Sequence, residues 1–315
     1  MRTLIITTGS SKIVLTRWLP LLRTVGQCDA DVMLMDYGII VSNRGMEKSN
    51  PLIVGKLRAE KGVTVIQPIV KMRNIFIDRM NVARSYLLEN NRYKNYDVIM
   101  IIDGNDTIFW GPIQPLLDMA KEKLCYVKEH FSNLLKIWDD FFPRDFIQKE
   151  YKSIENNPII NGGMIVGPTQ AILDVLNYEM DMVAMYGDSP SDQLFFDLLI
   201  YYFKYPSREV GFEWNYTHAV IGKDKNGNHY GPRMANFVDN KAYAVEDGRT
   251  IIIEHRTGTG WWFWKSKEGL ELLANDVPVS IMEEFKHSLN YKSLHFDAAR
   301  GVDPVLFLKF KYPAF

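Results

Sequence analysis

Residues 96–106 read YDVIMIIDGND, in which five consecutive apolar residues, 98–102, are followed at once by an acidic turn. A short continuous apolar run of this kind is typical of a strand buried on both faces. The Gly104-Asn105 pair tolerates the positive φ angles of tight turns. The segment therefore predicts a buried strand that ends at Asp103, and a turn that brings the carboxylates of Asp103 and Asp106 together.

These two carboxylates are a candidate metal site. Hard divalent cations such as Mg²⁺ and Mn²⁺ prefer carboxylate oxygens and leave coordination positions for phosphate oxygens and water. An isolated Asp-x-x-Asp is more often a solvated loop after a strand. The position of this pair favours the metal site, because open α/β sheets bind ligands at the carboxyl ends of their strands.

Strands and helices alternate around this segment. Apolar or β-branched runs predict strands at 4–8, 31–35 and 63–66. An apolar stripe of helical spacing predicts a helix over 78–90. The alternation predicts an α/β fold with a mostly parallel central sheet flanked by helices on both faces.

The second half of the chain continues this pattern. Residues 159–167 read IINGGMIVG, which predicts strand pieces broken by a glycine pair, and Pro168 opens a helix that extends to about Tyr186. A further helix is expected from about Ser191, and a buried strand over 251–253. We expect one domain over 1–265, with a C-terminal helical extension over 266–315, including a helix at 281–289, packed on it.

The composition excludes several classes of protein. The 315 residues carry 37 basic and 38 acidic side chains, so no overall field favours nucleic acid or an anionic membrane. Cys28 and Cys125 form neither a disulfide framework nor a zinc motif, which fits a reducing compartment. No run approaches the roughly 18 apolar residues of a membrane span, and 4–8 is too short for a signal-peptide core. We expect a soluble, cytoplasmic protein without a transmembrane segment or a nucleic-acid partner.

A second polar segment follows the apolar run 251–253. Residues 254–261 read EHRTGTGW. The neutral imidazole of His255 would suit Mn²⁺, and the backbone N–H groups of 257–260 would suit a phosphate. A lone histidine at a strand end is more often a hydrogen-bonded structural residue. The aromatic run 261–264 fits core packing better than a sugar-stacking face.

Taken together, residues 96–109 resemble the metal-binding segment of GT-A fold glycosyltransferases, in particular that of the procollagen glucosyltransferase domain of lysyl hydroxylases, where Asp-x-x-Asp replaces the commoner Asp-x-Asp. Strand 4–8, the INGGMIVG segment 160–167 and the SDQLF segment 191–195 follow the order of that family. Similarity to the glycogenin-like transferases is weaker. The resemblance covers about residues 1–265 and implies the Rossmann-like fold of a nucleotide-diphospho-sugar transferase.

This resemblance also implies ligands. It implies a nucleotide-sugar donor, most often UDP-linked, a hydroxyl acceptor such as a glycan, and Mn²⁺ or Mg²⁺ as the metal. Its metal ligands would be Asp103, Asp106 and His255. The residues expected to bind the donor are Thr7, Thr8, Gly9, Arg79, Gly162, Gly163, Gly258 and Lys265. A surface position without a role is the alternative for Arg79.

The same resemblance places Asn161, Asp192 and Gln193 beside the donor sugar. Asp192 also begins the predicted helix, and capping of the first turn is an alternative role for its carboxylate. A metal ion would act as a Lewis acid on the departing diphosphate, with retention of the sugar's configuration slightly preferred. Gly162 and Ser191 depart from the family's serine and acid, which leaves the donor sugar open.

Three other functions use similar features. A nucleotidyltransferase would need a glycine-rich signature followed by Arg and Lys after the first strand, and the segment 9–12, GSSK, matches it poorly. A phosphatase with an aspartyl nucleophile would need a second acid two residues after Asp103, where Asn105 stands. A non-catalytic sugar-binding protein on the same fold stays open.

Overall fold

The computed structural model describes residues 1–9, 30–37, 39–41, 45–47, 51–69, 75–104, 107–128, 152–154, 156–187, 192–217, 235–238, 241–244 and 248–255. The predicted extension 266–315, its helix and the aromatic run 261–264 lie outside these residues. The strands are β1 (Thr3–Gly9), β2 (Asp31–Asp36), β3 (Ile39–Val41), β4 (Gly45–Glu47), β5 (Val63–Ile66), β6 (Val98–Asp103), β7 (Thr107–Phe109), β8 (Leu124–Lys128), β9 (Ile160–Pro168), β10 (Ser207–Glu209), β11 (Tyr216–Thr217), β12 (Ala235–Val238), β13 (Lys241–Ala244), β14 (Thr250–Ile251) and β15 (Ile253–His255). The helices are α3 (Pro51–Ala59), α4 (Ile75–Leu88), α5 (Gln114–Ala120), α7 (Thr169–Tyr186) and α8 (Asp192–Asp197), with short helical turns η1 (Glu89–Asn95), η3 (Leu198–Tyr202) and η4 (Phe212–Trp214).

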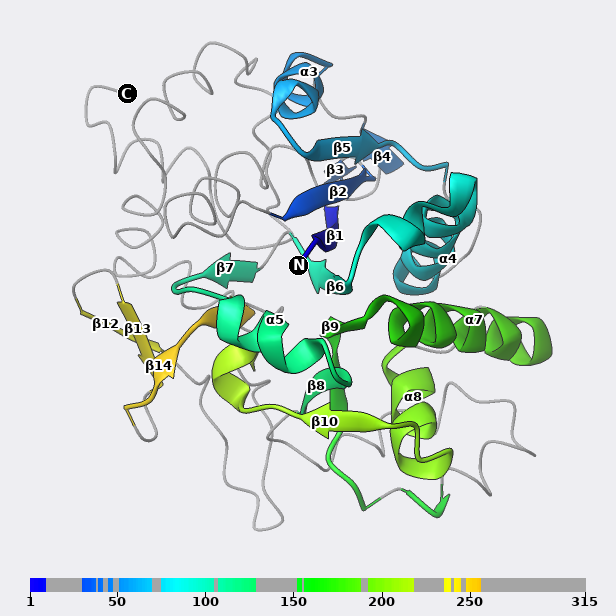
Figure 1. The fold of residues 1–315 in the computed structure, drawn as a ribbon, viewed down its shortest axis with the longest axis vertical. Helices are drawn as coiled ribbons and strands as arrows, with labels where there is room; N and C mark the ends of the chain where they lie inside the picture. The colour runs from blue at the N-terminus through cyan, green and yellow to red at the C-terminus, as the bar shows by residue number, and fades with distance from the viewer. Residues whose placement is uncertain are drawn as a thin grey trace.

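A seven-stranded sheet in the order β10-β8-β9-β6-β1-β2-β5 forms the centre of the molecule (Figure 1). Its strands pair in parallel except for β9, which runs antiparallel to both β6 and β8. The predicted α/β class with a mostly parallel sheet is confirmed. The acidic strand β6 lies between β1 and β9, so its carboxyl end is close to both.

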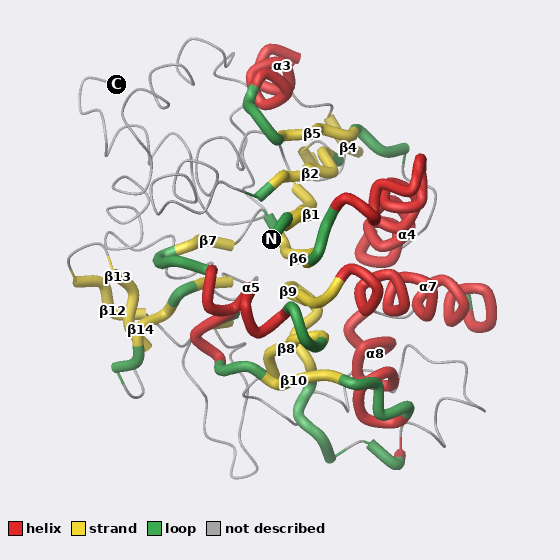
Figure 2. The backbone as a smooth tube through the Cα atoms, viewed as in Figure 1, coloured by secondary structure: helices red, strands yellow, loops and turns green. Residues whose placement is uncertain are grey.

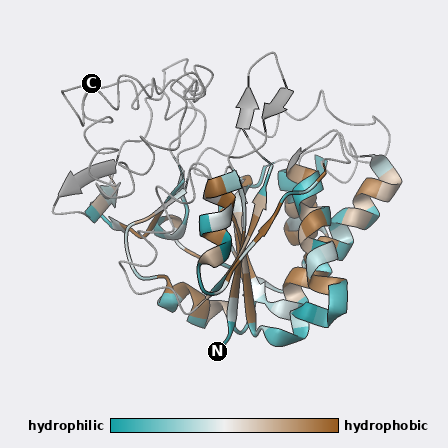
Figure 3. Cartoon of the chain, turned by 90° about the horizontal axis from the view of Figure 1, so that it is seen from above, coloured by the Kyte–Doolittle hydropathy of each residue, from teal (hydrophilic) through white to brown (hydrophobic). Residues whose placement is uncertain are grey.

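Helices cover both faces of this sheet, and the strands divide their side chains between them. In β6, Ile99 and Ile101 belong to the core cluster that includes side chains of α4, α7 and α8, whereas Val98, Met100 and Ile102 belong to the cluster that includes α3 and α5. Figure 2 shows α4, α7 and α8 together at one side of the strands. Figure 3 shows the apolar strands at the centre of the molecule, between helices with hydrophilic outer faces.

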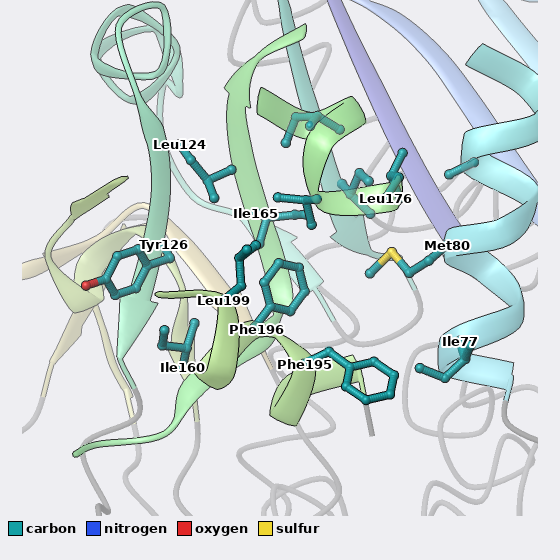
Figure 4. Packing of buried hydrophobic residues seen from close by; sticks show 14 of the residues in the cluster. Ile77, Met80, Leu124, Tyr126, Ile160, Ile165, Leu176, Phe195, Phe196 and Leu199 are labelled. Carbon is teal, nitrogen blue, oxygen red and sulfur yellow. The ribbon is translucent and has the colours of Figure 1, made fainter. Parts of the chain in front are cut away.

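The cluster on the α7 side fixes α8 against β9. Phe195, Phe196 and Leu199 are almost fully buried and pack near Ile165 of β9 and Met80 of α4 (Figure 4). Burial of a large apolar side chain contributes roughly 1.5–3 kcal/mol. This packing holds the first residue of α8, Asp192, at the edge of the sheet.

Three predicted elements differ in detail. The helix predicted over 78–90 is α4, which begins at Ile75 and ends at Leu88, because Asn90 and Asn91 adopt left-handed backbone angles with φ of 54°. The segment 160–168 is one continuous strand and is not broken at its glycine pair. The strand predicted over 251–253 is two strands, β14 and β15, which belong to two different small sheets.

No helix among the residues just described combines the length and the apolar character that a membrane crossing requires.

Candidate functional site

The buried guanidinium of Arg79 joins three distant segments of the chain. Arg79 lies on α4 and is only 4% exposed. Its Nη1 donates to Asp103 Oδ1, and its Nη2 donates to Asp192 Oδ2 at 2.7 Å and to the carbonyl oxygen of Gly162 at 3.0 Å. Charge-assisted hydrogen bonds of this kind are among the strongest in proteins. Arg79 is therefore not a surface residue, and it brings the ends of β6, β9 and α8 together.

Asp103 lies next to His255 because of the strand that follows the acidic turn. The turn is tied to β1 by the N–H of Gly104, which donates to the carbonyl oxygen of Thr8 at 2.9 Å. After the turn, β7 pairs antiparallel with β15, and Thr107 lies opposite His255. The Nε2 of His255 is 3.4 Å from Asp103 Oδ2, and His255 is 3% exposed. His255 thus ends a strand of a small second sheet that is separate from the seven-stranded central sheet.

The pair formed by Asp103 and His255 fits a divalent cation. Adjacent ligand atoms of an octahedral ion with metal–oxygen bonds of about 2.1 Å lie roughly 3 Å apart. Asp103 bonds Arg79 through Oδ1 and turns Oδ2 toward the imidazole. Mn²⁺ accepts both carboxylate oxygen and imidazole nitrogen. Within the described residues no group of three acidic, histidine or cysteine side chains surrounds one point; the third predicted ligand, Asp106, lies outside them.

The glycine pair of β9 lets other segments approach both faces of the strand. A Cβ atom on Gly163 would overlap the ring of His255 and lie 2.9 Å from Asn161 Oδ1. A Cβ atom on Gly162, on the opposite face, would lie 3.2 Å from Gln193 Cγ and 3.5 Å from Asp192 Oδ1. The predicted residues Asn161, Gly162, Gly163, Asp192 and Gln193 therefore lie in one place with Arg79, Asp103 and His255.

Asp192 is bound at both carboxylate oxygens. Oδ2 accepts from Arg79, and Oδ1 accepts from the backbone N–H of Gln193 at 2.8 Å. The second bond satisfies one backbone donor at the start of α8, so the predicted capping role accounts for one oxygen only. The other oxygen belongs to the charged cluster.

The remaining donor-binding predictions divide into two groups. Thr8 pairs with Asp103 across the sheet, and Gly9 follows it at the same edge. Thr7 lies one residue deeper, opposite Ile102, and is fully buried. Gly258 and Lys265 lie outside the described residues.

Two further buried residues lie beside this cluster. Asn215, 2% exposed, donates through Nδ2 to Asn161 Oδ1 at 2.8 Å. Glu179 on α7 is fully buried, and in the described part of the chain neither of its carboxylate oxygens has a hydrogen-bond partner. Burial, together with the charge of Asp192, raises the pKa of Glu179 well above its usual value, and Arg79 opposes this shift. Glu179 interrupts an apolar stripe with Leu176 and Met182, and that interruption is a signal visible in the sequence.

Solved structures with a similar fold include glycosyltransferases. An active-site mutant of LgtC matches with a TM-score of 0.50 and 13% identity over 92% of this chain and 100% of that chain. The galactosyltransferase LgtC in complex with donor and acceptor sugar analogues matches with a TM-score of 0.50 and 14% identity, again over 92% of this chain and 100% of that chain. The apo structure of the bifunctional glycosyltransferase WbbM matches with a TM-score of 0.53 and 14% identity, over 90% of this chain and 51% of that chain. This chain therefore spans about half the length of the WbbM chain.

No protein-family model matches the sequence, and a search of curated proteins finds no significant relative. At 13–14% identity, the structural similarity establishes the fold and not the activity. The mostly parallel seven-stranded sheet with helices on both faces matches the fold of the LgtC structures. The predicted fold class is therefore confirmed: the chain has the GT-A fold.

Proposed function

We propose that the protein is a metal-dependent glycosyltransferase that moves a sugar from a nucleotide-diphosphate donor, UDP-linked, to a hydroxyl group of a glycan. The observation that carries this proposal is the cluster of Arg79, Asp103, Asp192 and His255 at the carboxyl end of β6. Open α/β sheets bind their ligands at this edge. The description of LgtC as a galactosyltransferase supports a hexose as the transferred sugar.

Asp103 and His255, with Asp106 from the same turn, would hold Mn²⁺ or Mg²⁺. Bound there, the ion would offset the negative charge that develops on the departing diphosphate. The Asp103 carboxylate serves two partners through different oxygens, since Oδ1 accepts from Arg79 and Oδ2 faces His255. This division supports a role for Arg79 in holding the carboxylate at a fixed angle to the ion.

The residues around β9 would orient the donor sugar. Arg79 fixes the Asp192 carboxylate and the Gly162 carbonyl through one nitrogen, Nη2. Asn161 and Gln193 flank the same short stretch of backbone. Preorganised polar groups of this kind lower a barrier because they need no reorganisation during the reaction. In the transfer, the bond from C1 to the diphosphate breaks, a bond from C1 to the acceptor oxygen forms, and the hydroxyl proton is released.

A panel of nucleotide sugars tests this function. The protein is incubated with each donor and Mn²⁺, and free nucleotide is measured with and without EDTA. We expect release with at least one UDP-sugar, its loss in EDTA, and its loss in Asp103→Ala. Asp118→Ala is the matched control, because Asp118 is exposed on α5 and pairs only with Lys121 and Gln114 among the described residues.

Three results would contradict the proposal. Full activity of Asp103→Ala would place the reaction elsewhere. Binding of a nucleotide sugar without any turnover, with all acceptors tried, would favour the non-catalytic sugar-binding alternative. Turnover of a nucleoside triphosphate and a sugar phosphate would favour the nucleotidyltransferase alternative.

A further inference from the structure

The carboxyl group of Glu179 is buried near the guanidinium of Arg79, and no hydrogen bond joins them. Neither oxygen of Glu179 has a hydrogen-bond partner in the described part of the chain. The buried Nε–H of Arg79 has no acceptor there either. The charges of Arg79 and Asp192 both act on the pKa of Glu179, so the three groups lie within electrostatic reach of one another. An acceptor and a donor of complementary chemistry thus stand unbonded in one buried cluster.

The elements packed against α7 bring few other charges to Glu179. These elements are α4, α8, β6 and β9. β9 carries no titratable side chain, and β6 carries Asp103, which bonds Arg79. On α7 itself, burial and the charge of Glu179 raise the pKa of Tyr178 above its usual value, so this tyrosine stays neutral. The other charged side chains of α4 and α8 have hydrogen-bond partners: Asp78 with Tyr37, Arg84 with Asn177, and Asp197 with the N–H of Ile160.

Two carboxylates already share the positive charge of Arg79. Its Nη1 donates to Asp103, and its Nη2 donates to Asp192. Ionisation of Glu179 would add a third carboxylate to a buried cluster with one cation, where water screens the charges poorly. Arg79 would then turn its Nε–H toward Glu179 and loosen its other bonds, or Asp192 would move away from the new charge. Either movement disturbs groups that the proposed function assigns to the ion and the sugar.

We propose that the charged cluster binds the donor only while Glu179 is neutral, so that ionisation of Glu179 sets an alkaline limit on donor binding. This inference rests on the proposed function. Burial, together with the charge of Asp192, raises the pKa of Glu179, and the neutral form is the one present below that raised pKa. Donor binding should therefore be complete below the raised pKa and decline as the pH rises through it. By reciprocity, a bound donor favours the neutral form of Glu179.

The substitution Glu179→Gln isolates this ionisation. It keeps the length of the side chain and a neutral polar end, but it cannot lose a proton. The control is Glu89→Gln, which makes the same change at an exposed carboxylate that pairs with Arg92 at 2.6 Å. His255, the lysines and UDP itself titrate in all three proteins. Only a difference between Glu179→Gln and the other two therefore reports on Glu179.

Calorimetry measures the binding of UDP in excess MgCl₂ from about pH 6 to about pH 9, below the range in which exposed Lys and Tyr side chains ionise. MgCl₂ is used because Mn²⁺ precipitates at alkaline pH. At the acidic end, we expect the wild type and Glu179→Gln to bind UDP with affinities that differ by less than about twofold. At the alkaline end, the wild type and Glu89→Gln should bind UDP at least about tenfold more weakly than Glu179→Gln does, a difference of roughly 1.4 kcal/mol.

Two further measurements accompany these titrations. Urea denaturation at each pH shows whether each protein is folded. Titrations in two buffers of different ionisation enthalpy count the protons taken up with UDP. At the alkaline end, the wild type should take up more protons than Glu179→Gln, because bound UDP favours the neutral form of Glu179.

The same dependence of UDP affinity on pH in the wild type and Glu179→Gln would overturn the inference. A Glu179→Gln protein that is unfolded, or that binds UDP poorly, at the acidic end would also overturn it, because the carboxyl group would then act in some way other than through its charge. Failure of the wild-type protein to bind UDP at any pH would overturn the proposed function, and the inference with it. These failures are distinct, because only the last is visible without a substitution.

Discussion

Replacing Gly163 by alanine is expected to displace His255 from Asp103. The added Cβ would overlap the Cε1 atom of the imidazole and lie 2.5 Å from its Nδ1. The histidine is 3% exposed and cannot move aside without disturbing its neighbours. The Asn161 oxygen, 2.9 Å from the same Cβ, blocks the other direction. The imidazole must therefore rotate, or β9 must shift.

The size of the effect follows from these contacts. Overpacking a buried site costs about 1–3 kcal/mol of unfolding free energy. If the imidazole rotates instead, a bound ion loses a ligand, and its affinity should fall by at least the 10- to 100-fold (about 1.4–2.7 kcal/mol) seen when an outer-shell partner is removed. Gly162→Ala is the matched control for both quantities, because its Cβ would meet the flexible Gln193 side chain at 3.2 Å. We expect it to cost less than about 1 kcal/mol.

Urea denaturation measures the first quantity, and calorimetric titration with MnCl₂ measures the second. Gly163→Ala should lose stability, Mn²⁺ affinity or both, while Gly162→Ala keeps both near the wild-type values. If Gly163→Ala matches the wild type in both measurements, His255 does not lie against β9 as described. A larger loss of Mn²⁺ affinity in Gly162→Ala would move the ion to the opposite face of the strand.

Two further predictions concern the charged groups. Arg79→Gln leaves Asp103 and Asp192 without their cation and should lower the free energy of unfolding, measured by urea denaturation, by about 3–5 kcal/mol. The control Arg84→Gln, at a part-buried position on the same helix, should lower it by less than about 1 kcal/mol. Equal losses in the two variants would contradict the buried ion pair. Glu179 keeps its proton in the folded state at pH values where the unfolded chain has lost it, because burial raises its pKa. The stability that this proton contributes is complete below about pH 4 and is lost as the pH rises toward the raised pKa. Glu179→Gln cannot ionise, so it should be more stable than the wild type at pH 8 and lose that advantage at pH 4.5, and a difference independent of pH would contradict this account.

The sequence allowed the central sheet to be predicted because its strands are short, apolar and continuous. Val98–Ile102 could be read as buried on both faces from composition alone, and the structure divides its side chains between two cores. The antiparallel direction of β9 was not predictable, since direction depends on its partners. The division of the predicted strand 251–253 into β14 and β15 was not predictable either. It occurs at Ile252, whose backbone N–H donates to the carbonyl oxygen of Glu213 and whose carbonyl oxygen accepts from the N–H of Trp110. Those bonds come from distant segments, so no local pattern announces them.

The candidate site was predictable only in part for the same reason. Asp103 stands out locally because it ends an apolar strand. Arg79, Asp192 and His255 were grouped with it through resemblance to a family, and their contacts arise from tertiary structure. Asn215 carries no local signal, because an asparagine after a tryptophan in a turn is ordinary. Its hydrogen bond to Asn161 joins segments that are distant in the sequence and lies beside the pairing of β11 with β15.

Anomalous diffraction from a crystal grown with MnCl₂ and UDP tests the central claim most directly. The account predicts one manganese peak bonded to Asp103 Oδ2, to His255 Nε2 and to oxygens of the diphosphate. A manganese peak elsewhere, or UDP bound with no metal between Asp103 and His255, would contradict it.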